Sequence, residues 1–293
     1  MGKVLWSRKV EEEFFRENLY QLEKLFYPIG TKYYAYYPKS YKGKKQTLQS
    51  RNALIGEYTE KFCKRLLDTF AQKHKLFAVN KVVCEDLALT EKSPADLVLC
   101  TTPEKYQKPE NIKIIFEIKM SIVNNYEYNP ETKKIKFVGD YKTHIGNPSL
   151  LRSDSMLKAI GKALNIRISC DYAAKIPLII LGNTPIAPSY LEKVDKLKEK
   201  GFVQGFWSIY PESSIDLEKT PQEGFLTIKS CEDLYSKLEE MLNMDLQFVS
   251  FMLDKNSLGK CIQIASQENH LIDKANKFLQ LIKGMRDEKN FNI

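Results

Sequence analysis

The sequence is poor in the residues that several common catalytic and metal-binding motifs need. It contains only three histidines, far apart in the chain, and six scattered cysteines with no Cys-x-x-Cys pair. Zinc and iron–sulfur sites need ligands at closer spacing, and triad hydrolases need a histidine beside their nucleophile. We therefore expect none of these classes, nor a histidine-metal nuclease. The cysteines are expected to be reduced and mostly buried, as is typical of a cytoplasmic protein.

Nucleotide-binding and membrane signals are also missing. No Gly-x4-Gly-Lys-Ser/Thr sequence occurs, so we expect no nucleotide cofactor and no ATP-driven motor. No apolar run approaches the ~20 residues of a membrane helix. Residues 11–13 are all glutamate, where a secretory signal would have an apolar core. The sequence therefore predicts neither a membrane span nor a signal peptide.

Positive charge is concentrated in two windows, although the whole chain carries only a modest excess of 45 Lys and Arg over 37 Asp and Glu. Residues 28–51 hold six Lys or Arg, five Tyr and no acid. Residues 133–167 hold eight Lys or Arg against Asp140 and Asp154, a local charge of +6. Duplex DNA carries one negative charge per ~1.7 Å of axis, so clustered cations gain affinity by counterion release.

The first window has further features of a DNA-contacting segment. Its tyrosines can pack on sugars or against bases, and Gln46, Gln49, Arg51 and Asn52 carry donors and acceptors that read base edges. A soluble loop between two helices is the alternative interpretation. The predicted DNA-binding residues in the two windows are Lys32, Tyr36, Lys42, Lys44, Lys45, Gln49, Arg51, Lys136, Arg152, Lys158 and Lys162.

Three charged residues stand in two apolar segments that are predicted to be strands. Asp96 follows Pro94-Ala95 and precedes Leu97-Val98-Leu99-Cys100, and residues 112–120 contain Glu117-Ile118-Lys119. Strand side chains alternate, so Glu117 and Lys119 share one face while Ile114, Phe116, Ile118 and Met120 share the other. Pairing of the two strands places Asp96 beside Glu117, where two carboxylates can share a hard divalent cation. The alternative is a surface aspartate and an unrelated Glu–Lys pair.

The order of predicted elements indicates an α/β protein with a mixed central sheet flanked by helices. We expect a helix over residues 52–74, strands over 76–84, 96–100 and 112–120, and a hairpin over 122–143. A helix over 153–167, capped by Ser153 or Asp154, a strand over 176–181, a helix over 188–200 and a strand over 202–210 follow. Helical patterns at 231–243 and 266–285 predict a helical C-terminal extension. The predicted organisation is an N-terminal helix and basic segment (1–50), a catalytic core (51–212) and a mainly helical region (213–293), which packs on the core or forms a dimer interface.

This arrangement resembles the PD-(D/E)XK nuclease superfamily, to which many type II restriction endonucleases belong. The resemblance covers about residues 50–210 and rests on Asp96, Glu117 and Lys119 in their strands. The proline lies one position earlier than in the named motif. The resemblance implies a restriction-endonuclease-like core that hydrolyses double-stranded DNA and leaves a 5′-phosphate and a 3′-hydroxyl.

The resemblance also implies roles for individual residues. Asp96, Glu117 and the main-chain carbonyl of Ile118 would bind Mg²⁺, with Mn²⁺ as a substitute, and Lys119 would position the attacking water. Glu57, in the preceding helix, would reach the metal shell, and Glu60 competes for that role. Lys158 and Lys162, four residues apart on one helix face, are the basic residues expected near the active site or, alternatively, part of a solvated stripe.

We therefore expect a site-specific DNA endonuclease, and a homodimer because protein symmetry mirrors the symmetry of a palindromic site. Three alternatives remain open at this stage. A repair or recombination nuclease would cut flaps or junctions, a non-catalytic DNA-binding protein would bind without cutting, and a small-molecule α/β enzyme would leave the tyrosine-rich basic window unexplained.

Overall fold

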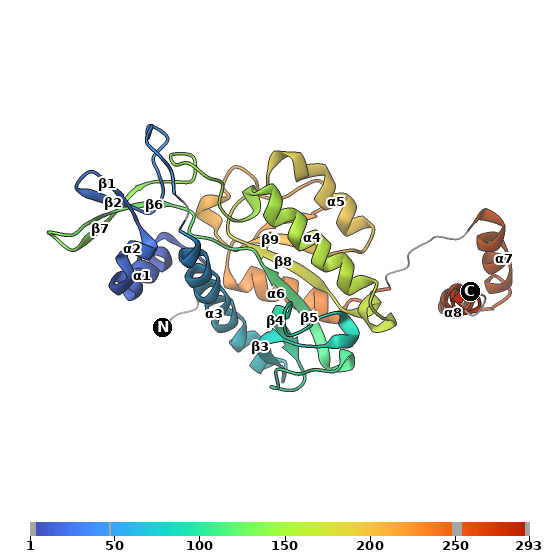
Figure 1. Ribbon diagram of the computed structural model, residues 1–293. Helices are drawn as coiled ribbons and strands as arrows, with labels where there is room; N and C mark the ends of the chain where they lie inside the picture. The colour runs from blue at the N-terminus through green and yellow to red at the C-terminus, as the bar shows by residue number, and fades with distance from the viewer. Residues whose placement is uncertain (1–3, 47, 248–253, 291–293) are drawn as a thin grey trace. The chain divides into compact units, whose positions relative to one another are not determined.

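The computed structural model describes residues 4–46, 48–247 and 254–290, with the backbone alone for Gln49 and residues 285–290. The chain divides into two compact units, Met1–Phe248 and Val249–Ile293. The first unit contains both sheets and most of the helices (Figure 1). The site predicted from the sequence lies in this unit.

The first unit is an α/β structure built on a six-stranded mixed sheet in the order β10-β9-β8-β5-β4-β3. Neighbouring strands from β3 to β5 are antiparallel, whereas β5, β8, β9 and β10 run parallel. The strands are β3 (Phe77–Val82), β4 (Ala95–Cys100), β5 (Ile112–Ile118), β8 (Leu178–Gly182), β9 (Gly205–Ser208) and β10 (Phe225–Thr227). The last strand comes from beyond residue 212, where the sequence places the end of the core.

Alternation of side chains along the central strands produces two apolar faces covered by different helices. Leu97, Leu99 and Phe116 pack on one face with side chains of α3 and α6. Val98 and Ile115 point to the opposite face, which α4 and α5 cover. Figure 1 shows these layers. The helices are α3 (Gln49–Lys73), α4 (Ser153–Arg167), α5 (Leu191–Glu199) and α6 (Cys231–Asn243).

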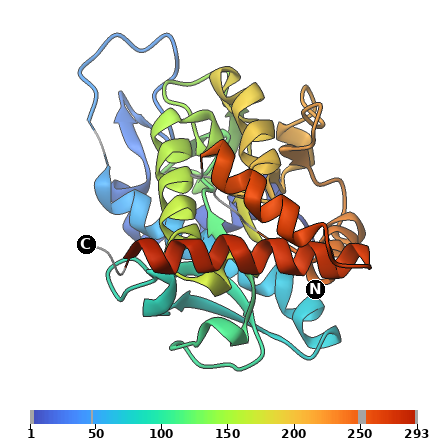
Figure 2. The ribbon, with the colours of Figure 1, turned by 90° about the vertical axis from the view of Figure 1, so that its right-hand side faces the viewer.

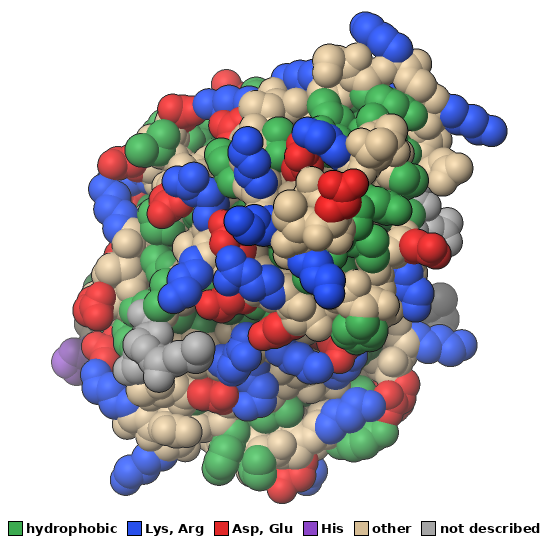
Figure 3. Space-filling model, turned by 90° about the vertical axis from the view of Figure 1, so that its left-hand side faces the viewer, with side chains coloured by type: hydrophobic (Ala, Val, Ile, Leu, Met, Phe, Trp, Pro, Cys, Tyr) green, Lys and Arg blue, Asp and Glu red, His purple; other side chains and the backbone are tan. Residues whose placement is uncertain are grey.

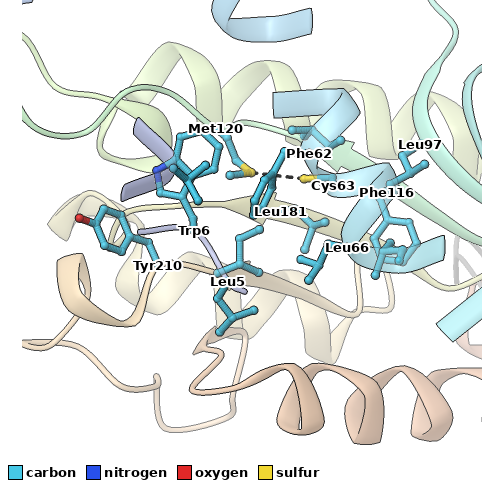
Figure 4. Close-up of a cluster of buried hydrophobic side chains, with 14 of the residues drawn as sticks. Leu5, Trp6, Phe62, Cys63, Leu66, Leu97, Phe116, Met120, Leu181 and Tyr210 are labelled. Carbon is cyan, nitrogen blue, oxygen red and sulfur yellow. Dashed lines mark hydrogen bonds between the residues drawn. The ribbon is translucent and has the colours of Figure 1, made fainter. Parts of the chain in front are cut away.

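The first of these faces contains large aromatic side chains close to the end of β5. Trp6 meets Phe62 of α3 edge-on, with 5.1 Å between ring centroids. Cys63 of the same helix contacts Met120, with 3.4 Å between their sulfur atoms (Figure 4). Burial of such side chains contributes about 1.5–3 kcal/mol each, so this cluster fixes the chain directly beyond Lys119.

A second, four-stranded antiparallel sheet has the order β1-β2-β6-β7. The expected hairpin is present as β6 and β7, and Asn129 Oδ1 accepts bonds from the amides of Glu131 and Thr132 in its turn. The hairpin β1–β2, turning at Gly30 with φ +62°, was not predicted. The strands are β1 (Tyr27–Ile29), β2 (Lys32–Tyr34), β6 (Asn125–Asn129) and β7 (Lys134–Gly139), preceded by helices α1 (Arg8–Asn18) and α2 (Leu22–Leu25).

Two predicted helices have the bounds that the sequence indicates, α4 and α6. The predicted cap of α4 is wrong, because neither Ser153 nor Asp154 caps it and Asp154 pairs with Arg152 at 2.8 Å instead. Ser230 does cap α6 by accepting a bond from the amide of Asp233. All six cysteines are free, and five of them are buried.

The second unit consists of α7 (Lys255–Ala265) and α8 (Leu271–Asn290), which pack on each other across a short turn (Figure 2). The sequence predicts only the second of these helices. Asp254 caps α7 by accepting bonds from the amides of Asn256 and Ser257. Across the described parts of both units, no helix is long and apolar enough to cross a membrane.

Candidate active site at the divergence of β4 and β5

The predicted pairing of β4, which contains Asp96, with β5, which contains Glu117, is present. The two strands diverge at these two residues. Leu97 pairs with Phe116 in the ladder between β4 and β5. One step further along, the side chain of Asp96 takes the place of a backbone acceptor, and its Oδ2 accepts a 2.7 Å bond from the amide of Ile118. The divergence of the strands thus places a carboxylate at the end of the sheet.

Glu117 and Lys119 point away from the core cluster, as the alternation predicts. Ile114, Phe116 and Ile118 belong to the core on the α3 side of the sheet, so Glu117 and Lys119 face α4. The side chain of Glu117 is only 7% exposed. Lys162 extends from α4 to meet it.

Four charged side chains form a compact cluster in which each carboxylate meets both ammonium groups. Lys119 Nζ contacts Glu117 Oε1, lies 3.8 Å from Asp96 Oδ2 and is 3.4 Å from the carbonyl oxygen of Ile118. Lys162 Nζ lies 2.6 Å from Glu117 Oε2 and 3.4 Å from Asp96 Oδ1, and it donates to the carbonyl of Pro94 at 2.7 Å. The three residues predicted to form the active site are therefore together, with Lys162 as a fourth member.

The environment shifts the titration of this cluster. Burial raises the pKa of Glu117, and the negative charge of Asp96 raises it further, while Lys119 and Lys162 oppose the shift. Burial lowers the pKa of Lys162, but the charges of Asp96 and Glu117 outweigh burial, so its pKa is raised. The ammonium form of Lys162 is therefore stabilised inside the cluster.

The structure separates the two glutamates of α3 that compete for a place beside the site. Glu57 is exposed and forms a 2.7 Å ion pair with Lys61, which lowers its pKa. Glu60 is half-buried, and burial followed by the charge of Asp96 raises its pKa. Glu60, and not Glu57, is thus electrostatically coupled to the cluster. Helical periodicity could have distinguished the two glutamates, because Glu60 lies seven residues before the buried Leu67 and so on the inward face of α3.

Lys81 is a nearby residue that the sequence did not indicate. It lies in β3 between Asn80 and Val82, which pair with Leu97 and Ala95 on either side of Asp96. Its backbone has φ +55°, a left-handed conformation that is strained for a side chain other than glycine. Its charge lowers the pKa of Glu60. No motif or spacing marks Lys81, because the strain arises only from the sheet geometry.

Most of the predicted DNA-binding cations lie at the surface. Lys32 pairs with Glu127 at 3.0 Å, and Arg152 is half-exposed beside Asp154. Figure 3 views the molecule from the side of the four-stranded sheet and shows Lys and Arg side chains spread among Asp and Glu side chains. The exposed members that form no salt bridge within the described residues are Lys42, Lys44, Lys45, Lys136 and Lys158.

Three of the predicted DNA-binding residues are packed inside the protein, namely Lys162 in the charged cluster and Arg51 and Tyr36 elsewhere in the fold. Arg51 is 3% exposed, donates to the carbonyl of Ala35 and lies 4.4 Å from the centre of the Tyr36 ring. Tyr36 stacks on His144 at 3.9 Å and donates a 2.6 Å bond to the carbonyl of Ile122. Tyr36 therefore connects the basic segment to the chain just beyond Lys119, whereas Arg51 contacts Ala35 and Tyr36 within that segment. The side chain of Gln49 lies outside the described residues.

The metal-binding capacity of the site depends on two carboxylates and a backbone carbonyl. In residues 4–46, 48–247 and 254–290, no group of three or more His, Cys, Asp or Glu side chains is arranged to hold a metal ion. Asp96, Glu117 and the Ile118 carbonyl nevertheless offer only oxygen donors, which suit Mg²⁺ because this ion keeps several waters and needs few protein ligands. A cation already lies against all three, since Lys119 Nζ contacts each of them.

Comparison with known proteins adds no assignment, because no family model, no curated protein and no solved structure matches the chain. Its function must be inferred from the chemistry of its own residues. Two carboxylates that hold cations at the end of a sheet can bind a divalent ion, and the two lysines can place positive charge beside a phosphate.

Proposed function

We propose that the protein is a metal-dependent endonuclease that hydrolyses double-stranded DNA at a specific short sequence, as type II restriction enzymes of the PD-(D/E)XK superfamily do. The observation that carries this proposal is the convergence of Asp96, Glu117 and Lys119 where β4 and β5 part. These are the three residues on which the resemblance to that superfamily rests. The expected products carry a 5′-phosphate and a 3′-hydroxyl.

Mg²⁺, with Mn²⁺ as a substitute, is the cofactor that the donor atoms suit. Asp96 Oδ2, Glu117 Oε1 and the Ile118 carbonyl would hold it, because a single ammonium group now contacts all three. When bound, such an ion lowers the pKa of a coordinated water and neutralises charge on the scissile phosphate.

The chain's own residues supply the remaining functions. In this proposal Lys119 moves from its carboxylate partners to orient the attacking water and to place a fixed positive charge beside the phosphate. The half-buried Glu60 contributes a further carboxylate to the water shell of the site. Asn80 holds Asp96 in place, because its Nδ2 donates 2.9 Å and 3.3 Å bonds to the carbonyls of Asp96 and Glu60.

The exposed cations are assigned to the DNA backbone. Lys42, Lys44 and Lys45 lie in the segment between β2 and α3, and Lys136 lies on β7. Contacts of this kind give affinity through counterion release and carry no sequence information by themselves. A palindromic recognition site would be matched by a homodimer. Six free cysteines are consistent with a protein of the reducing cytoplasm.

A cleavage assay tests the proposal directly. Purified protein is incubated with plasmid or phage DNA in Mg²⁺ or in EDTA, beside Lys119→Ala and the matched control Lys113→Ala. Lys113 is an exposed lysine on the same strand, and it donates to the carbonyl of Glu110, away from the cluster. Discrete fragments that need Mg²⁺, are lost in Lys119→Ala and persist in Lys113→Ala are the expected result.

Three other outcomes would change the assignment. A metal-dependent smear that is lost in Lys119→Ala would retain the nuclease and remove the sequence specificity, and cleavage confined to flaps or junctions would indicate a repair nuclease. Intact DNA in every lane, with retarded migration, would leave a DNA-binding protein without catalysis.

A further inference from the structure

The two carboxylates of the active site form two cation positions of the same composition. The first position consists of Asp96 Oδ2, Glu117 Oε1 and the carbonyl oxygen of Ile118, and Lys119 Nζ contacts all three. The second consists of Asp96 Oδ1, Glu117 Oε2 and the carbonyl oxygen of Pro94, and Lys162 Nζ contacts all three. Each position thus takes one oxygen from each carboxylate and one from the backbone.

The two lysines are held in these positions by contacts of different number and length. Lys119 lies 3.8 Å from Asp96 and 3.4 Å from the Ile118 carbonyl, so Glu117 is its one close partner in the cluster. Lys162 makes two short contacts, 2.6 Å to Glu117 and 2.7 Å to the Pro94 carbonyl, and a third of 3.4 Å to Asp96. The two lysine side chains are about equally exposed, 17% for Lys162 and 19% for Lys119, but Lys162 extends from α4, which packs on the sheet through Met156 and Ala163. Lys162 is therefore the more firmly held cation.

We propose that this active site uses a single divalent ion, because Lys162 permanently fills the position that a second ion would need. The inference rests on the proposed function and specifies its metal stoichiometry. Two-metal nucleases place two ions about 3.5–4 Å apart on shared carboxylates, so both sides of the carboxylate pair must be open to metal. Here one side is closed by an ammonium group with a backbone anchor.

The charges of the cluster agree with this arrangement. Asp96 and Glu117 carry two negative charges, and Lys162 cancels one of them while it stays in place. A divalent ion that displaces Lys119 from the first position then leaves the cluster with a net charge of +1, which suits a phosphodiester. A second divalent ion would have to displace Lys162 from a buried ion pair, which is costly because the ammonium would lose the Pro94 and Glu117 contacts.

Metal titration in the absence of DNA tests the inference without using activity. Binding of Mn²⁺ to the full chain is followed by the electron paramagnetic resonance signal of free Mn²⁺, up to millimolar concentration. The wild-type protein and Lys162→Arg, which keeps the charge, are expected to bind one Mn²⁺ per chain. Lys162→Ala and Lys162→Met are expected to bind two, because the second position is vacated.

Lys158→Ala is the matched control, since Lys158 lies one turn earlier on α4 and is exposed; it should still bind one Mn²⁺. Thermal unfolding of each metal-free variant shows whether it is folded, and Lys162→Met keeps the aliphatic stem if the alanine variant is not. Two ions per wild-type chain, or one ion per chain in a folded Lys162→Met variant, would overturn the inference and leave the nuclease proposal intact. One ion in the wild type and two in Lys162→Met, without any DNA cleavage, would retain the inference and remove the nuclease activity.

Discussion

Two buried glutamates in this protein are held in opposite ways. Glu11 of α1 is fully buried and accepts five hydrogen bonds, all from neutral donors. Glu117 is also buried, but its closest partners are the ammonium groups of Lys119 and Lys162. Within the described residues no salt bridge involves Glu11. Burial raises the pKa of both carboxyl groups, so burial alone does not distinguish them.

The difference lies in what the partners can do. The donors to Glu11 are the Trp6 indole, the backbone amide of Val123, the backbone and side-chain amides of Asn124 and the Tyr126 hydroxyl, and all are fixed by the backbone or by packing. They tie α1 to the segment that follows the active-site strand. The ammonium groups around Glu117 end long side chains, and a lysine can leave one partner and contact another. A carboxylate with neutral donors is thus structural, whereas one with lysine partners can exchange one cation for another.

The largest effect that separates these roles is expected in Glu117→Gln. Loss of this carboxylate removes a proposed metal ligand, so DNA cleavage should fall by at least about 10³-fold. The thermal unfolding temperature should change little, because relief of the ionised carboxylate, whose pKa burial raises, is offset by the loss of a partner for Lys162. Parallel cleavage and unfolding measurements check both statements. A variant that unfolds more easily and still cleaves DNA would show that Glu117 is a structural residue like Glu11.

The reverse result is expected for Glu11→Ala. This change removes the acceptor of five buried hydrogen bonds, so the free energy of unfolding should decrease by about 3–5 kcal/mol, as measured by urea denaturation. Glu12, the next residue along the helix, is partly exposed and pairs with Arg16 at 3.0 Å, and it provides the matched control. Glu12→Ala should cost less than about 1 kcal/mol. Equal losses in the two variants would mean that the Glu11 network contributes no more than a surface ion pair.

The same contrast shows what the sequence reveals and what it conceals. Alternation along residues 112–120 is a local pattern, and it correctly placed Glu117 and Lys119 opposite the core face. Nothing local marks Glu11, which stands in a run of three glutamates. Its partners lie more than 110 residues away in sequence, apart from the indole of Trp6. Only the folded chain brings these donors to one carboxylate.

Long-range pairing also explains the other differences between expectation and structure. Arg51 and Tyr36 of the basic tyrosine-rich window were predicted to be exposed to DNA, and both are packed where β2 pairs with β6. A hairpin can be predicted from its own turn, whereas its partner strand cannot. The spacing of Lys158 and Lys162 placed both on one helix face, and the structure brings only Lys162 into the site, because it follows the buried Ala159 by three residues.

Glu60 and Glu57 allow a finer test, because they lie one turn apart on α3 and differ in coupling to Asp96. Glu60→Gln should reduce the rate of DNA cleavage about 10- to 100-fold, the usual range for a residue that acts on the metal shell through its neighbours. Glu57→Gln removes only an exposed pair with Lys61 and should leave the rate within about twofold. Titration of the rate against Mg²⁺ concentration distinguishes weaker metal binding from a slower step. Equal rates for both variants would remove Glu60 from the site.

The smallest expected effect is a pH-dependent difference in stability between the wild-type protein and Glu11→Gln. Burial raises the pKa of Glu11 in the folded protein above its ordinary value of 4.5. The folded state therefore binds this proton more tightly than the unfolded state does, and the linked stability is fully present below about pH 4.5 and is lost as pH rises through the raised pKa. Glutamine cannot titrate at this position. At acidic pH, Glu11→Gln should therefore lower the free energy of unfolding by about 1–3 kcal/mol because its donors are mismatched, and this loss should shrink as pH rises.

Urea denaturation of both proteins across this pH range measures the difference directly. The raised pKa values of Glu60 and Glu117 affect both proteins equally, and they cancel when one unfolding free energy is subtracted from the other. A difference that stays constant with pH would show that Glu11 has the same pKa in the folded and unfolded chains. In that case five neutral donors would stabilise the buried charge as well as water does, and more effectively than the lysines stabilise Glu117, whose pKa remains raised.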